Sequence, residues 1–309
     1  MFISEINEED LKGLRNTIEY YKHFTKDGIT SSLMERQLLE MLKRPKSFLP
    51  FFPLQIGESR QEVYRLTVNK KIHGTNTRIR NLKELKYPPK DRVTKYGRCN
   101  MPNESVLYGT FDHITMLNEI LPKPGDLVSV SRWKAKRNST LVFCPIFLNQ
   151  PTTGTFNPRT FEITQLFDRE LSKYSQNHKD ELTALYQFFT DEFSKRVGEN
   201  DRNYLFSAFY SSKILHEAAY GNIDAIRYPS VQQNLSFENI AIKATSFDLK
   251  YEIVEVYDGI VDLSGRFISV FNTCKEFDGI SGEILWSNQI NWAPEQLLFF
   301  KQQYGLDLN

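Results

Sequence analysis

Residues 98–119 (RCNMPNESVLYGTFDHITMLNE) combine an arginine, a tyrosine and a carboxylate, three side chains that can act on a phosphate-bearing ligand. The segment predicts a turn after Arg98, a short strand that contains Tyr108 and a helix that carries Glu119. A guanidinium binds phosphate oxygens through paired donors, and a carboxylate can balance positive charge that develops in a reaction. We expect strand and helix to bring the three side chains close together.

A local excess of positive charge leads into this segment. Between Arg65 and Arg98 the chain has eleven Lys or Arg residues against two acids, a local charge of +9, whereas the whole chain carries +1 and the remainder therefore −8. One interpretation is a solvated loop, and the other is a site for a phosphate-bearing ligand. Nucleic acid is a weaker candidate, because no aromatic-interleaved or helix-turn-helix signature accompanies the charge.

The composition is that of an ordinary globular protein. The 309 residues, 40% hydrophobic and 25% charged, suffice for one large domain or a domain with appendages. No apolar run approaches the roughly 18 residues of a membrane helix, and the acidic N-terminus MFISEINEEDLK does not read as a secretory signal. Cys99, Cys144 and Cys274 are widely spaced without zinc-ligand spacing, which favours a reducing, cytoplasmic compartment.

Common catalytic and cofactor motifs are absent. The chain contains no G-x-S-x-G, H-E-x-x-H, P-loop or G-x-G-x-x-G sequence. Its five histidines are scattered, and only His113 falls near the candidate segment. We therefore expect neither a metal site nor a bound cofactor.

The N-terminal residues predict two helices. Residues 6–22 place Leu11, Leu14, Ile18 and Tyr21 on one stripe. Residues 32–43 predict a second helix that begins with a capping box of Ser32 and Glu35. Nothing in this part of the chain looks catalytic.

The remainder predicts an α+β arrangement, because strands gather at both ends with helices between them. In the strand expected at 62–68, Tyr64, Leu66 and Val68 share one face, while Val63, Arg65 and Thr67 share the other. An irregular excursion is expected over 69–98. Further strands are predicted at 105–109, 127–133, 140–147, 224–229, 239–244, 251–257, 266–271 and 282–287, and helices at 160–174, 179–197, 201–219 and 294–304.

Five ordered segments between residues 62 and 252 resemble the RES-domain family. They are VYRL (63–66), GRCNMP (97–102), VLYGTFD (106–112) followed by HITMLNE (113–119), DAIRYPS (224–230) and ENIA (238–241). Each segment alone is a weak signal, and their order and spacing strengthen it. The resemblance implies a mixed-sheet core with packed helices, related to ADP-ribosyltransferases. It divides the chain into an N-terminal helical extension (1–56), a RES-like catalytic domain (57–257) and a C-terminal extension packed on that domain (258–309).

The resemblance also implies an enzyme that consumes NAD by cleaving its nicotinamide–ribose bond. Family members pass ADP-ribose to phosphate or to water, some are reported to modify a protein, and many are toxins silenced by an antitoxin. An NAD phosphorylase or glycohydrolase is therefore the first hypothesis, with NAD and inorganic phosphate as ligands and an antitoxin or a second copy of the chain as partner. A protein mono-ADP-ribosyltransferase and a non-catalytic anion- or nucleic-acid-binding module are the alternatives.

The resemblance implies roles for seven residues. Glu119 is expected to bind the ribose and balance its developing charge, although on the residues alone a solvated helix glutamate would be favoured. Arg65 and Arg98 are expected to bind the diphosphate. The alternative for Arg65 is a salt bridge on the strand face, and the alternative for Arg98 is one solvated charge among many in a basic loop. Tyr108 can stack on nicotinamide or orient a ribose hydroxyl. The alternative is that Tyr108 is a structural tyrosine of the core. Ser230, Tyr228 and Asn239 are expected to contact or support the substrate, with structural roles at least as well founded for the last two.

Overall fold

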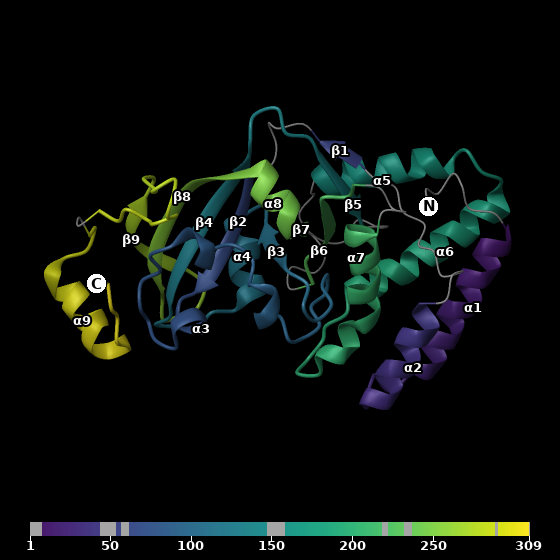
Figure 1. Ribbon diagram of the computed structural model, residues 1–309, viewed down its shortest axis with the longest axis horizontal. Helices are drawn as coiled ribbons and strands as arrows, with labels where there is room; N and C mark the ends of the chain where they lie inside the picture. Colours follow the sequence, from purple (N-terminus) through teal and green to yellow (C-terminus); the bar gives the residue numbers. More distant parts are fainter. Residues whose placement is uncertain are drawn as a thin grey trace. The chain divides into compact units, whose positions relative to one another are not determined.

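The computed structural model describes residues 8–43, 54–56, 62–146, 158–217, 222–231, 237–287 and 290–308. The chain is an α+β protein with a mixed sheet, as expected. It forms two compact units that are interleaved in sequence. Unit 1 comprises residues 1–56, 89–106 and 141–243, and unit 2 comprises residues 57–88, 107–140 and 244–309. Each unit is described by itself below (Figure 1).

Unit 1 is mainly helical. Its helices are α1 (Glu8–Phe24), α2 (Ser32–Leu42), α5 (Pro158–Leu171), α6 (Gln176–Phe193) and α7 (Leu205–His216), with 3₁₀ turns at Lys90–Arg92 and Asp201–Tyr204. The predicted stripe of α1 is confirmed, because Leu11, Leu14, Ile18 and Tyr21 are all buried. The aromatic core between α1, α6 and α7 includes Tyr21, Phe188 and Phe206, whose rings lie within 6.1 Å of one another.

The strands of unit 1 follow the order β1-β5-β6-β7 and make the sheet mixed. They are β1 (Leu54–Ile56), β5 (Leu141–Pro145), β6 (Ala225–Pro229) and β7 (Glu238–Lys243). β5 and β6 are parallel, whereas β1–β5 and β6–β7 are antiparallel. On β6–β7 the buried pair Arg227 and Glu238 lies on one face, and Tyr228 and Asn239 oppose each other on the other face.

The strands of unit 2 follow the order β3-β2-β4-β8-β9, with every neighbouring pair antiparallel. They are β3 (Val106–Thr110), β2 (Glu62–Val68), β4 (Leu127–Ala135), β8 (Tyr251–Val261) and β9 (Ile268–Cys274). Its helices are α3 (Lys70–His73), α4 (His113–Ile120), α8 (Ala244–Lys250) and α9 (Pro294–Tyr304), with a 3₁₀ turn at Leu82–Glu84. The last helix, α9, confirms the prediction for 294–304.

Helix α4 packs on one face of the sheet in unit 2 (Figure 1). Asp112 begins the helix and accepts a hydrogen bond of 2.8 Å from the backbone nitrogen of Thr115. Met116 is buried in a cluster with Leu66 and Val68 of β2, and the cluster also holds side chains of β4 and β8. The face of β2 predicted to carry Tyr64, Leu66 and Val68 is therefore the face that α4 covers.

Two expectations about local structure are wrong, and two short elements were not predicted. Ser31, not Ser32, is the cap of α2, since its hydroxyl accepts from the nitrogen of Met34. Glu35 instead receives hydrogen bonds from Tyr96 and Arg202. Residues 282–287 form isolated bridges rather than a strand. Strand β1 and helix α8 were not predicted, because segments of three and seven residues carry too little periodicity.

The units also differ from the expected linear division. The expected boundary after residue 257 falls inside β8, the strand that joins β4 to β9. The segment expected to be an extension therefore supplies strands to the sheet of unit 2. Hydrogen bonding between strands joins residues far apart in sequence, which no local pattern reports.

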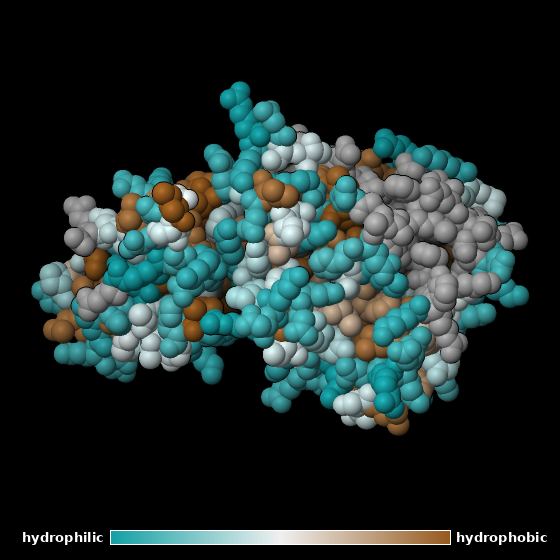
Figure 2. Space-filling view, in the orientation of Figure 1, coloured by the Kyte–Doolittle hydropathy of each residue, from teal (hydrophilic) through white to brown (hydrophobic). Residues whose placement is uncertain are grey.

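The described surface lacks one dominant apolar area on the face seen in Figure 2, where hydrophobic side chains form separate small groups among hydrophilic ones. Exposed apolar residues include Leu263, Phe267 and Ile280 in the turns of unit 2. Within the described part of the chain, no helix has the length and apolarity needed to cross a membrane.

Candidate functional site

Arg65 of β2 is an enclosed guanidinium without an acidic partner among the described residues. Its Nη1 donates a 3.0 Å hydrogen bond to the carbonyl oxygen of Tyr108, and its Nε is buried with no hydrogen-bond partner. Burial lowers the pKa of Arg65 to about 10, so the group stays charged at neutral pH. The residue as a whole keeps partial exposure. A buried cation with unused donors is costly unless an anion accepts from it, which favours an anion-binding role.

The strand opposite Arg65 leaves room for this arrangement. The register of β2 and β3, in which Tyr64 opposes Thr110, places Gly109 opposite Arg65. A Cβ atom on Gly109 would collide with the side chain of Val63 and approach the carbonyl oxygen of Tyr64 to 3.1 Å. Glycine therefore allows β3 to lie close enough for its backbone to hold the guanidinium.

Arg65 and helix α4 occupy opposite faces of the sheet in unit 2. Side chains alternate along β2, so Arg65 faces away from Leu66, which packs against α4. The same register places the side chain of Tyr108 on the α4 side, where Glu119 lies on a flank of the helix and is partly exposed. Arg65 thus contacts the backbone of Tyr108, and the sheet lies between it and the helix that carries Glu119.

In unit 1, Arg98 is engaged by the end of helix α6. Its guanidinium donates to the carbonyl oxygens of Phe193 and of Lys195, the latter at 3.0 Å, and lies 5.0 Å from the ring centre of Tyr204. A cation beside the last carbonyls of a helix satisfies unpaired acceptors and the helix dipole. Arg98 therefore has a structural partner that Arg65 lacks.

Three of the predicted residues of unit 1 lie beside one another. The guanidinium of Arg98 is 5.8 Å from the ring centre of Tyr228, which opposes Asn239 on the same face of β6–β7. Ser230 extends this ladder through its backbone nitrogen, which donates to Phe237 at 2.7 Å. Asn239 is buried, and its Oδ1 has no hydrogen-bond partner. An unpaired carbonyl oxygen suits a hydroxyl or amide donor rather than a phosphate.

The predicted residues thus form two groups, one in each unit. Arg65, Tyr108 and Glu119 belong to unit 2, and Arg98, Tyr228, Ser230 and Asn239 belong to unit 1. Two grooves of unit 1 are lined by other residues. One, of about 600 Å³, lies between α1 and α2, and the other, of about 370 Å³, lies between α1 and α6.

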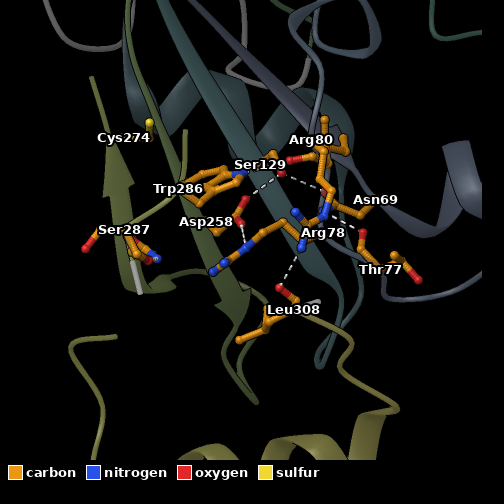
Figure 3. Close-up of polar contacts among 12 residues, drawn as sticks. Asn69, Thr77, Arg78, Arg80, Ser129, Asp258, Cys274, Trp286, Ser287 and Leu308 are labelled. Carbon is orange, nitrogen blue, oxygen red and sulfur yellow. Dashed lines mark hydrogen bonds and ion pairs between the residues drawn. The ribbon is translucent and has the colours of Figure 1, made fainter. Parts of the chain in front are cut away.

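A buried polar network in unit 2 was not predicted (Figure 3). Nε of Arg78 lies 3.0 Å from Oδ2 of Asp258, and the hydroxyl of Ser129 donates to Oδ1 of Asp258 at 2.6 Å. The Arg78 guanidinium also lies 4.8 Å from the ring centre of Trp286. The network ties the 76–82 segment and the C-terminal residues to the sheet. Its members are up to 180 residues apart in sequence, so no local sequence pattern indicates that they pair.

Asp258 gives a prediction for the pH dependence of stability. Burial raises the pKa of Asp258 from 3.8 to about 6, opposed by Ser129 and Arg78. The folded state then binds this proton more tightly than the unfolded state, so the stabilising contribution is complete below pH 4 and lost as pH rises through 6. It amounts to roughly 3 kcal/mol. Urea unfolding between pH 4 and 7 should show that Asp258→Asn removes this slope, and an unchanged slope in the variant would contradict the assignment.

The basic segment is partly neutralised within unit 2. Besides the Arg78 pair, Lys70 contacts Asp126, and Lys86 lies 2.9 Å from Asp248. These partners come from parts of the chain that carry the compensating negative charge. The local field is therefore weaker than the sequence count suggests, and Arg65 combines a buried guanidinium with the lack of such a partner among the described residues.

The three cysteine thiols are buried and protonated. Cys99, Cys144 and Cys274 are buried thiols that form no disulfide with one another, and burial raises the pKa of each thiol. A raised pKa keeps a thiol protonated and unreactive. Within the described ranges, no group of three or more His, Cys, Asp or Glu side chains is placed to hold a metal ion.

Comparison with known proteins adds no further constraint on the site. No protein-family model matches the chain, and no curated protein matches it.

Proposed function

We propose that this protein cleaves the nicotinamide–ribose bond of NAD and that Arg65 binds the diphosphate. The observation that carries the proposal is the enclosed guanidinium of Arg65, which has unused donors and no carboxylate partner among the described residues. The resemblance to the RES-domain family also assigns diphosphate binding to Arg65. The proposal includes a core related to ADP-ribosyltransferases, with which the mixed α+β architecture is compatible.

The proposed reaction needs little acid catalysis. The bond between C1′ of the ribose and the pyridinium nitrogen breaks, and its electron pair leaves with neutral nicotinamide. The ribose passes through an oxocarbenium-like state, as in glycoside hydrolysis. A phosphate or water oxygen then bonds to C1′, and water loses a proton in the hydrolytic case. The resemblance gives the ribose to Glu119, whose carboxylate would balance the developing charge. Because the sheet lies between Glu119 and Arg65, each of these two assignments is tested by its own variant.

In unit 1, taken by itself, the resemblance assigns Tyr228, Ser230 and Asn239 to substrate contact. Oδ1 of Asn239 is an unpaired acceptor that can receive a ribose hydroxyl or the carboxamide of nicotinamide. Tyr228 and Ser230 support Asn239 on the same strand pair. Arg98 is assigned to positioning Tyr228 rather than to the diphosphate, because the carbonyls of α6 already engage it.

The proposed cellular setting follows the same resemblance. Three buried cysteines that form no disulfide with one another accord with a reducing compartment, so we place the protein in the cytoplasm. Activity of this kind depletes NAD and would require restraint by an antitoxin-like partner. A protein acceptor for ADP-ribose is the alternative outcome of the same chemistry.

The test is incubation of the purified full chain with NAD, with and without inorganic phosphate, followed by chromatography and mass spectrometry. We expect nicotinamide together with ADP-ribose, or with phosphorylated ADP-ribose when phosphate is present. Transfer of label from NAD to lysate proteins would instead identify a protein acceptor. The Arg65→Gln protein, purified identically, controls for contaminating glycohydrolases. NAD left intact under both conditions and without transfer would overturn the proposal.

A further inference from the structure

The hydroxyl of Thr67 is a second buried group without a hydrogen-bond partner on the Arg65 face of β2. Thr67 is 6% exposed, and its Oγ1 is paired with no described residue. It follows Arg65 by two positions, so the two side chains project from the same face roughly 6.6 Å apart along the strand. Buried hydroxyls are normally hydrogen-bonded, and an exception calls for an explanation.

Neighbouring side chains do not supply the missing partner. Ser129 opposes Thr67 on β4, but its hydroxyl is committed to Asp258 at 2.6 Å and to Asn69 at 3.0 Å. Ser131 opposes Arg65, and its hydroxyl accepts from the indole nitrogen of Trp133 at 2.8 Å. Both serines are therefore held in the protein's own network. On the strand face that Arg65 and Thr67 share, Nε of Arg65 and Oγ1 of Thr67 are both buried without a hydrogen-bond partner.

We propose that Thr67 and Arg65 together bind one diphosphate group, with the Thr67 hydroxyl donating to one phosphoryl group and the Arg65 guanidinium to the other. Two donors at successive positions of one strand face match two adjacent phosphoryl groups better than a single carboxylate. Arg65 is partly exposed, whereas Thr67 is buried. The inference rests on the proposed function for the identity of the diphosphate as that of NAD. Its test is binding rather than turnover.

The experiment measures pyrophosphate binding to the full chain by calorimetry, at fixed ionic strength, with inorganic phosphate as a second ligand. Thr67→Val removes the hydroxyl and keeps the shape, and we expect pyrophosphate affinity to fall at least about tenfold, the scale of a hydrogen bond to a charged group. Thr67→Ser keeps a hydroxyl and should bind within about threefold of the wild type. Phosphate should bind more weakly than pyrophosphate to the wild type and respond less to Thr67→Val.

The matched control is Thr110→Val on the neighbouring strand. Thr110 is also buried, but its hydroxyl already donates to the carbonyl of Asp112 at 2.9 Å. The control should therefore bind pyrophosphate like the wild type. In the absence of ligand, Thr67→Val should melt no lower than the wild type, because no protein hydrogen bond is lost, whereas Thr110→Val should melt lower.

Several results would overturn the inference. They are unchanged pyrophosphate affinity in Thr67→Val, an equal loss in Thr110→Val, or no binding by the wild type. Thr67→Ala provides a second hydroxyl-free variant if Thr67→Val does not fold. Pyrophosphate binding that depends on Thr67, in a protein that leaves NAD intact, would support the diphosphate site and refute the proposed reaction. NAD turnover with a KM unaffected by Thr67→Val would support the proposed reaction and refute the role of Thr67 in binding the diphosphate.

Discussion

Glu119→Gln should lower the rate of NAD cleavage by at least about 100-fold, the scale observed when one group that stabilises a transition-state charge is removed. An amide retains the shape of the carboxylate and loses its negative charge. The helix should persist, since its packing depends on Met116 and the adjacent apolar residues and its start depends on Asp112. Single-turnover measurement of nicotinamide release, together with circular dichroism, checks both expectations.

Glu252→Gln is the matched control for this variant. Glu252 lies in the same unit, in an exposed ion pair of 3.1 Å with Lys134, and should be dispensable for turnover. Full activity of Glu119→Gln would remove Glu119 from the mechanism. It would also restrict the chemistry to the face of the sheet that carries Arg65, which is the face turned away from α4.

Arg65→Gln should abolish detectable pyrophosphate binding and raise the KM for NAD by about 100-fold or more, because two charge-assisted hydrogen bonds of about 1.5–3 kcal/mol each are lost. Arg65→Lys should recover only part of this affinity. An ammonium lacks the planar set of donors that lets Arg65 bind the backbone of Tyr108 and an anion at once. Calorimetry and steady-state kinetics measure the two effects.

Arg132→Gln provides the comparison within the same sheet. Arg132 opposes Tyr64 on the other face and is paired with Glu62 at 3.1 Å and Glu255 at 2.9 Å. Its loss removes an equal charge from a guanidinium that is already ion-paired with two carboxylates. Equal weakening of pyrophosphate binding by Arg132→Gln and Arg65→Gln would show that net charge, rather than the Arg65 geometry, governs binding.

Hydrophobic periodicity in the sequence predicted which side chains of a strand or helix face the core. The alternation of β2 placed Arg65 on the opposite face from Leu66. The helical stripe of α1 placed Leu11, Leu14 and Ile18 in the core, where they are buried. The 3.6-residue and two-residue periods determine which side chains share a face. Short segments such as β1 escaped notice because three residues complete no period.

The relations between distant residues could not be predicted in this way. Arg98 was expected to bind a phosphate. In the structure it donates to backbone carbonyls at the end of α6, which lie nearly a hundred residues further along the chain. The pairing of Asp258 with Arg78 likewise depends on how β8 docks beside β4. Thr67 carries no sequence signal that separates it from an ordinary strand residue, and its unpaired hydroxyl depends on how β2 and β4 pair.

The interleaving of the two units has a consequence for how the protein is made. The chain passes between units at residues 57, 89, 107, 141 and 244, so neither unit is a continuous stretch of polypeptide. The strand β4, which lies beside β2, gains its other neighbour β8 only after more than a hundred intervening residues have been synthesised. During translation, β4 therefore has an unpaired edge until β8 has been synthesised. Chaperones that bind such edges should associate with the nascent chain during this interval.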